Sequence, residues 1–141
     1  MKVHVIDDEN MIFVRLDDGE DFFEELTKAL KEQNVQAGIV INAIGMLRNF
    51  EIGWFNTSTM QYEKEFISQP HELTSVQGNI SKKDGDIFIH AHVTLAGASR
   101  AIVGGHLFKA EVCNTAEIFI KKLDINLVRK QAQGFRPLEV E

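Results

Sequence analysis

The 141-residue chain has a single cysteine, Cys113, and no apolar run long enough to span a membrane. One thiol excludes an internal disulfide, so a reducing cytoplasm is the expected compartment. The first ten residues turn acidic too early for a secretory signal peptide. We therefore expect a cytoplasmic protein that does not enter a membrane, with Cys113 as a small buried residue.

Concentrated positive charge is also lacking. The formal net charge is −6, and the densest basic clusters are the pairs Lys82–Lys83 and Lys121–Lys122. A single domain that binds DNA normally presents a continuous basic face. The charge therefore argues against autonomous nucleic-acid binding, although an assembly of several chains can concentrate local patches.

No linker, repeat or low-complexity tract divides the sequence, which predicts one domain over residues 1–141. Residues 17–38 predict the principal helix, because their apolar residues recur at helical spacing, the first turn is acidic and Gly38 follows the end. The remaining segments favour strands, including one or two before the helix and a short one in the tail, residues 131–140. Turn signals lie at residues 56–58, 69–70 and 83–85. The expected fold class is α+β, with a mainly antiparallel sheet and one principal helix after the first strands.

Such a sheet has edges that need cover. Exposed strands invite pairing with other chains, and one helix covers little of a large sheet. We expect the exposed sheet edges to be covered by other copies of the chain in a cyclic homo-oligomer. The residues alone do not determine the number of copies.

The strongest functional pattern is a set of histidines in one predicted β-hairpin, residues 87–110. Residues two apart in a strand point the same way, so His90 and His92 share a face. A turn over residues 97–99 would pair Ala96 with Arg100 and place His106 directly across from His90. This register also matches several cross-strand neighbours in size: Phe88 with Phe108, Val93 with Val103, Ile89 with Leu107 and Gly104 with His92.

Three convergent imidazoles supply three neutral nitrogen ligands, the number that a catalytic zinc site uses while a fourth position stays open. A strand histidine is more often a hydrogen-bonded structural residue, and other divalent metals accept such sites too. Gly104 and Gly105 remove side chains beside the cluster, as expected where something approaches the backbone closely. His4 and His71 lie outside the hairpin and are interpreted as ordinary histidines.

Several motifs in a fixed order resemble one known family. They are GNIS at residues 78–81, HAH at 90–92 and GGHL at 104–107, together with DGED before the helix, AGIVINAIGMLRN after it and TAEIFI after the hairpin. The sequence thereby resembles the plants-and-prokaryotes-conserved (PPC) domain of the stand-alone prokaryotic type, over nearly its whole length. The resemblance implies a sandwich with a mainly antiparallel sheet, and assembly as a trimer.

What the resemblance implies about function is divided. In plants the domain is fused to AT-hook segments that grip DNA, and prokaryotic relatives are described as DNA-binding by that analogy. This sequence has no Arg-Gly-Arg-Pro hook. Its His90, His92 and His106 resemble the ligands of zinc-binding prokaryotic members, which implies zinc as cofactor. The fold also looks similar to that of acetolactate decarboxylase, a three-histidine zinc enzyme, but fold kinship does not transfer activity.

An open zinc site would suit a lyase or hydrolase, and such chemistry needs a general acid or base near the metal. Glu111 and Glu117 follow the hairpin closely and are the candidates, with solvated strand carboxylates as the plainer interpretation. Arg48 is a candidate for holding an anionic substrate, or else a surface or interface arginine. Asn79 and Ser81 are interpreted as turn residues, with the lining of a pocket as the alternative.

Three hypotheses follow. The first is a metal-dependent enzyme or small-molecule sensor, which predicts a cavity over the metal with a titratable neighbour. The second is a DNA-associated regulatory module, which predicts a basic face on the oligomer. The third is a structural metal, or bare histidines, in an oligomer without a substrate, which predicts a closed site. The negative charge disfavours the second, and the neutral ligands with adjacent glycines favour the first.

Overall fold

The computed structural model describes residues 1–6, 10–132 and 134–141. Strands dominate it, as expected, and the described part contains one helix. In chain order the elements are β1 (Lys2–Ile6), β2 (Met11–Asp17), α1 (Phe22–Glu32), β3 (Gly38–Asn56), β4 (Gln61–Ile67), β5 (His71–Lys83), β6 (Asp86–Ala96), β7 (Ile102–Lys122), β8 (Leu127–Arg129) and β9 (Leu138–Val140). The short β8 was not predicted, and the expected final strand is β9.

Two strands, β3 and β7, are much longer than the others. β3 runs through 19 residues and β7 through 21, and the two pair with each other through several register shifts. Such bulges let a long strand bend and change neighbours without ending. Asn56 ends β3 at the first predicted turn, and Pro70 and Gly85 lie in the predicted turns that join β4 to β5 and β5 to β6.

The central strands pair in a ring. β3 pairs with β5 and β7, and β6 pairs with the same two strands, all antiparallel. The other neighbours extend this ring: β2 and β1 beyond β7, β4 beside β3, and β8 with β9 beyond β5. The ring itself therefore has no open edge, and the outermost described strands of the sheet are β1, β4 and β9.

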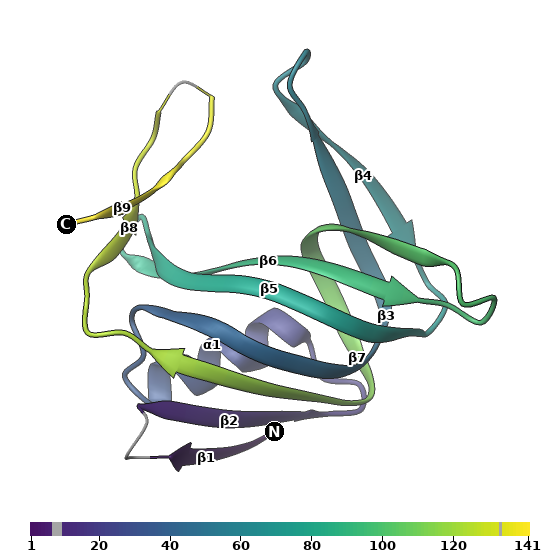
Figure 1. Cartoon of the computed structure of the whole chain (residues 1–141), viewed down its shortest axis with the longest axis horizontal. Coiled ribbons are helices and arrows are strands. Elements are labelled where there is room, and N and C mark those ends of the chain that lie inside the picture. Colours follow the sequence, from purple (N-terminus) through teal and green to yellow (C-terminus); the bar gives the residue numbers. More distant parts are fainter. Residues whose placement is uncertain (7–9, 133) are drawn as a thin grey trace.

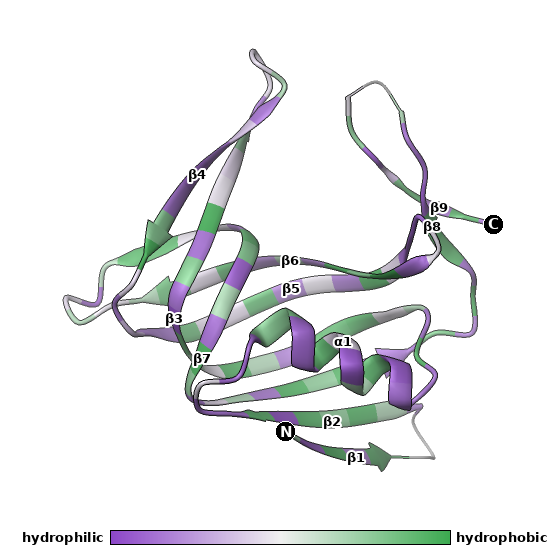
Figure 2. Cartoon of the chain, turned by 180° about the vertical axis from the view of Figure 1, so that it is seen from behind, coloured by the Kyte–Doolittle hydropathy of each residue, from purple (hydrophilic) through white to green (hydrophobic). Residues whose placement is uncertain are grey.

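The helix packs into the curved sheet. Asp21 caps its N-terminus by accepting a hydrogen bond from the backbone of Glu24 over 2.8 Å, and the acidic first turn suits the helix dipole. Its buried face contacts β2, β6 and β7. Figure 2, which views the molecule from behind, shows the helix lying across the sheet. The residues predicted for that face are the buried ones: Phe22, Leu26, Ala29 and Leu30.

Two hairpins project from the same side of the body, as Figure 1 shows. One is the distal part of β3 with β4, and the other is the β8–β9 segment near the C-terminus. β5 and β6 run between their bases (Figure 1), and residues of both hairpins line one cavity together with residues of β6. The helix in the described part of the chain is neither long nor apolar enough to cross a membrane.

Candidate metal centre

The alternation along β6 places its histidines on the outer face. Ile89, Ala91, Val93 and Leu95 are buried in the core, while His90 is half-buried and His92 exposed. This confirms the predicted division of the strand, because successive side chains of a strand point to opposite faces.

The predicted register of the hairpin is wrong by two residues. Ala96 pairs with Ile102, so the turn takes residues 97–101 and His106 lies across from His92 instead of His90. The backbone of Gly97 donates to the carbonyl of Ala101 and closes this longer turn. A shift of two preserves which face each side chain occupies, so the three histidines still share one face.

Strands β6 and β7 diverge just beyond that histidine pair. His106 is also the partner of Gly53 in β3, and from there β7 follows β3 while β6 follows β5. The predicted pairs of Phe88 with Phe108 and of Ile89 with Leu107 therefore do not form. The histidines converge where the two strands separate.

Their ring nitrogens lie close together. One nitrogen from each of His90, His92 and His106 lies within 4.8 Å of the others. Nε2 of His90 and Nε2 of His92 are 3.2 Å apart. Two nitrogen ligands of a tetrahedral zinc ion at about 2.0–2.1 Å are separated by about 3.3–3.4 Å. The spacing of the first pair thus suits a shared ion.

Two of the imidazoles are held neutral. Burial lowers the pKa of His90 to about 4, helped by the nearby charge of Arg129. Burial also lowers the pKa of His106 to about 4, with the neighbouring His90 as the next cause. Because only the unprotonated imidazole has a lone pair for a metal, both side chains are available as ligands at neutral pH.

The hydrogen bonds around the cluster favour different tautomers. Nδ1 of His106 lies 3.5 Å from the hydroxyl oxygen of Tyr62, which can accept a hydrogen bond from Nδ1–H and so leave Nε2 unprotonated. His90 differs, because Nη2 of Arg129 donates to its Nδ1 over 3.0 Å. A guanidinium has no acceptor, so Nδ1 of His90 carries the lone pair and Nε2 the proton.

The glycines beside the cluster are explained by strand packing. A Cβ on Gly104 would come within 2.6 Å of the carbonyl oxygen of Val93, and one on Gly105 within 2.6 Å of that of Gly53. Gly105 also has a φ of +151°, which side chains disfavour. The close approach that the sequence predicted is made by the neighbouring strands β6 and β3.

A cavity of about 720 Å³ opens over the histidines. Its walls come from the end of β5, from β6 and β7, and from the β3–β4 hairpin and the β8–β9 segment, consistent with the arrangement in Figure 1. This volume is in the range of small-molecule sites. Besides the histidines, the lining consists of Phe55, Tyr62, Lys83, Phe88, Phe108, Arg129, Gln131, Gly134, Phe135 and Arg136.

The predicted acid–base and anion-binding residues lie outside this lining. Arg48 forms ion pairs with Glu111 and with Asp18, and Asn49 donates to the second carboxylate oxygen of Glu111 over 3.1 Å. These hydrogen bonds lower the pKa of Glu111. Glu117 is exposed on β7 and accepts a hydrogen bond from the hydroxyl of Thr115 over 3.5 Å. The structure thus brings Arg48 and Glu111 together, but in a separate ionic cluster.

Sequence reasoning missed Arg129 and Tyr62, which contact the histidines. Asn79 was interpreted as a turn residue, yet it lies in β5 directly across from His90 and accepts from Arg129 over 2.8 Å. Arg129 follows His90 by 39 positions and joins it only because β8 adds to β5 in parallel. No local spacing carries that information. The buried Cys113 is confirmed.

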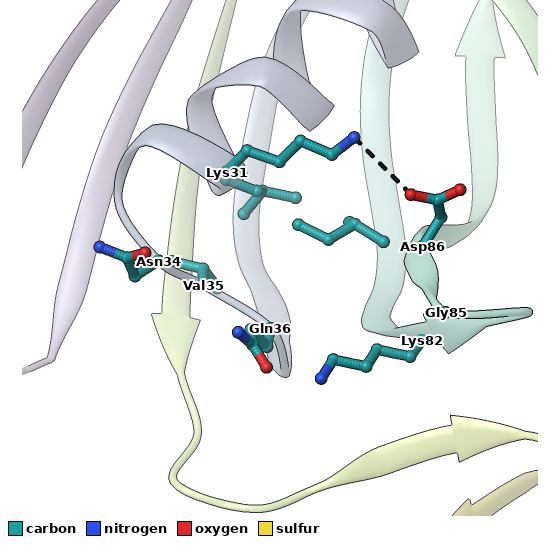
Figure 3. A pocket seen from close by; sticks show the side chains of 9 residues that line it. Lys31, Asn34, Val35, Gln36, Lys82, Gly85 and Asp86 are labelled. Atoms are coloured by element: carbon teal, nitrogen blue, oxygen red, sulfur yellow. Dashed lines mark ion pairs between the residues drawn. The ribbon is translucent and has the colours of Figure 1, made fainter.

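A second hollow, of about 230 Å³, lies between the end of α1 and the β5–β6 turn (Figure 3). Lys31 extends across it toward Asp86, with 3.9 Å between Nζ and Oδ1. Its lining has no histidine or cysteine, so the chemistry for a metal site lies in the larger cavity.

Comparison with known proteins agrees with the order of motifs. The Plants and Prokaryotes Conserved (PCC) domain matches residues 6–124 of the chain. The chain belongs to this family. A curated relative, the bifunctional protein GlmU of Synechococcus sp. (strain JA-3-3Ab), is 30% identical over 91% of this PCC chain. The chain spans only 20% of the length of that relative.

Solved structures share the fold. A plant- and prokaryote-conserved protein of Pyrococcus horikoshii is 33% identical, with a TM-score of 0.85 over 92% of this chain and 90% of its own. A metal-containing protein of Archaeoglobus fulgidus is also 33% identical, with a TM-score of 0.82 over 90% and 91%. A candidate DNA-binding protein of Bacteroides thetaiotaomicron has a TM-score of 0.89 over 99% and 96%, but its identity of 20% shows the fold alone.

Proposed function

We propose that this PCC protein holds a divalent metal ion, with zinc as the best fit, at His90, His92 and His106, and binds a small molecule beside it. The observation that carries the proposal is the 3.2 Å separation of two Nε2 atoms under an open cavity. The neutral state of His90 and His106 supports it, because the donor set is the uncharged nitrogen set that zinc accepts. The metal-containing relative of Archaeoglobus fulgidus supports a metal in a similar fold.

A bound zinc ion would supply Lewis acidity, either to a water molecule or to a substrate carbonyl. The chain's own residues would do the rest. The aromatic walls would exclude water from an apolar ligand, and Tyr62 is placed to hold or donate a proton beside His106. We therefore favour a lyase or hydrolase, or a sensor that uses the same site, over a purely structural metal.

The proposal includes a homo-oligomer. Ile39, Ile41 and Ile44 of β3 leave 39%, 50% and 57% of their surface exposed. A second copy of this chain is the occupant that we propose for this strip, since the family resemblance favours a trimer.

Metal analysis of purified protein tests the site. We expect one ion per chain in the unaltered protein, none in His92→Ala, and an unchanged content in His4→Ala, which removes an exposed histidine of β1. His92 is exposed, so its loss should leave the fold intact. Metal-free unaltered protein, or a His92→Ala variant that keeps its metal, would refute the proposal.

Cobalt substitution separates an open site from a structural one. An open position should take up azide and change the visible absorption of Co²⁺, whereas a closed four-ligand site should not respond. A spectrum that ignores azide would favour the structural alternative.

A further inference from the structure

The cavity over the histidines is lined by positive but not by negative side chains. Lys83, Arg129 and Arg136 contribute to its walls, and none of its described lining residues is an aspartate or glutamate. This contrasts with the chain as a whole, whose net charge is −6. A local excess of cations in an acidic protein indicates a preference for an anion.

Two of these cations already have partners. Arg136 forms an ion pair with Asp84 over 2.6 Å. The Nζ atom of Lys83 lies 4.7 Å from the ring centre of Phe88, in a cation–π contact. The ion pair compensates the charge of Arg136. The cation–π contact does not neutralise Lys83, and the guanidinium of Arg129 makes a similar contact with the same ring at 5.4 Å.

Arg129 has no carboxylate partner in the described parts of the chain. Its donors go to neutral acceptors only: the carbonyl of Arg136 at 3.0 Å, Oδ1 of Asn79 at 2.8 Å and Nδ1 of His90 at 3.0 Å. Its Nε is buried without a hydrogen-bond acceptor, and burial lowers the pKa of the guanidinium. Because a partly buried cation without a counter-ion is costly, an incoming anion would be favoured there.

Metal binding would release one of these donors. If Nε2 of His90 is a metal ligand, the ring proton must be on Nδ1. Two N–H groups, those of His90 Nδ1 and Arg129 Nη2, would then face each other and their hydrogen bond would be lost. The N–H of Arg129 would then be free for another acceptor.

The remaining walls are apolar. Five aromatic side chains line the cavity: Phe55, Tyr62, Phe88, Phe108 and Phe135. Rings of this kind favour contact with an aromatic or branched hydrocarbon body.

We propose that the cavity binds a small organic anion with an aromatic or branched apolar body, whose anionic oxygens pair with Arg129. This deepens the proposed function, on which it rests for the role of the metal, and it names the ligand class. Arg129 takes the role that the sequence suggested for Arg48, whose charge is compensated by Asp18 and Glu111.

Calorimetric titration tests the proposal with four probes: benzoate, phenyl phosphate, the neutral benzamide, and acetate, which has no ring. We expect benzoate or phenyl phosphate to bind about tenfold or more tightly than benzamide and acetate. The comparison of benzoate with phenyl phosphate decides which anionic group is preferred. Each titration is run on metal-loaded and on metal-free protein.

Two substitutions of Arg129 test whether its positive charge binds the anion. Arg129→Gln should weaken binding of the anion about tenfold or more and leave benzamide unchanged, while Arg129→Lys should keep part of the preference for the anion. Arg15→Gln is the matched control, because it removes an arginine that is ion-paired with Asp17 over 2.8 Å and does not line the cavity, and it should change affinity less than about threefold. Thermal unfolding and metal content of each variant show that the fold and the metal site survive.

The outcomes separate the two proposals. If the unaltered protein purifies without metal and cannot be loaded with it, yet binds the anion through Arg129, this inference is upheld and the metal site is refuted. Stoichiometric metal with equal affinity for benzoate and benzamide, or with no effect of Arg129→Gln, would overturn the inference and leave the metal site standing.

Discussion

Arg129 donates a hydrogen bond from Nη2 to Nδ1 of His90 over 3.0 Å, so a cation of the C-terminal segment fixes the tautomer of a central histidine. His90 can then donate from Nε2 to Nε2 of His92, 3.2 Å away. The same two atoms would be ligands in a metal complex. The cluster thus has two arrangements, a hydrogen-bonded chain and a metal site, and the position of one proton distinguishes them.

The first prediction concerns that proton. In protein treated with a chelator at neutral pH, we expect His90 as the Nε2–H tautomer and His106 as the Nδ1–H tautomer. Long-range ¹H–¹⁵N spectra of the imidazoles measure this directly. Arg129→Gln should shift His90 toward a mixture of tautomers, whereas Arg136→Gln should not. A His90 protonated on Nδ1 in the unaltered protein would contradict the hydrogen bond.

The second prediction concerns acid stability of the metal-free protein. The folded pKa values of His90 and His106 are about 4, below the ordinary value of 6.5, so between these limits the unfolded chain binds more protons. The free energy of unfolding should therefore fall as the pH drops from about 6.5 to about 4. We expect a loss on the order of 2 kcal/mol for the pair, because both groups are half-exposed and solvent screens part of the effect.

Chemical denaturation at several pH values measures this loss. A His90→Gln/His106→Gln variant should show a flatter pH dependence in the same window, since glutamine does not titrate. Parallel curves for the variant and the unaltered protein would assign the acid sensitivity to carboxylates elsewhere.

The third prediction concerns the strand crossing beside His106. Gly105→Ala should destabilise the fold by about 2–4 kcal/mol, because the new Cβ would meet the carbonyl of Gly53 and the backbone φ is unsuitable. Gly85→Ala is the matched control: it has a φ of +85° but nothing within 4 Å of the new Cβ, so about 1 kcal/mol is expected. Urea midpoints compare the two. Equal losses would mean that only the backbone angle matters at Gly105.

The fourth prediction concerns assembly. If the isoleucine strip of β3 is covered by a second copy, Ile41→Lys should shift the mass measured by light scattering from a multiple of the 15.9 kDa chain to 15.9 kDa. Ile125→Lys, which changes another exposed isoleucine outside β3, should leave the mass unchanged. A monomeric unaltered protein would remove the oligomer from the proposal.

The local patterns of the sequence determined much of the fold. Helical spacing around Leu26 predicted α1, because one apolar stripe must face the core. Strand alternation put His90 and His92 on the outer face, and a register error of two residues could not change that, since the strand period is two. The order of the motifs indicated the family.

Only the tertiary structure decided the rest of the site. The divergence of β6 and β7 at His106 depends on β3, which competes for the same strand edge. In the hairpin sequence Gly105 indicates a close approach at this point, but not which strand makes it. Glu111 follows His106 closely in the sequence but pairs with Arg48, whereas Arg129 lies 39 positions beyond His90 and contacts it. Sequence spacing determines which side chains lie together within one helix or strand. Which distant segment supplies the charge beside them depends on strand pairing, here the parallel addition of β8 to β5.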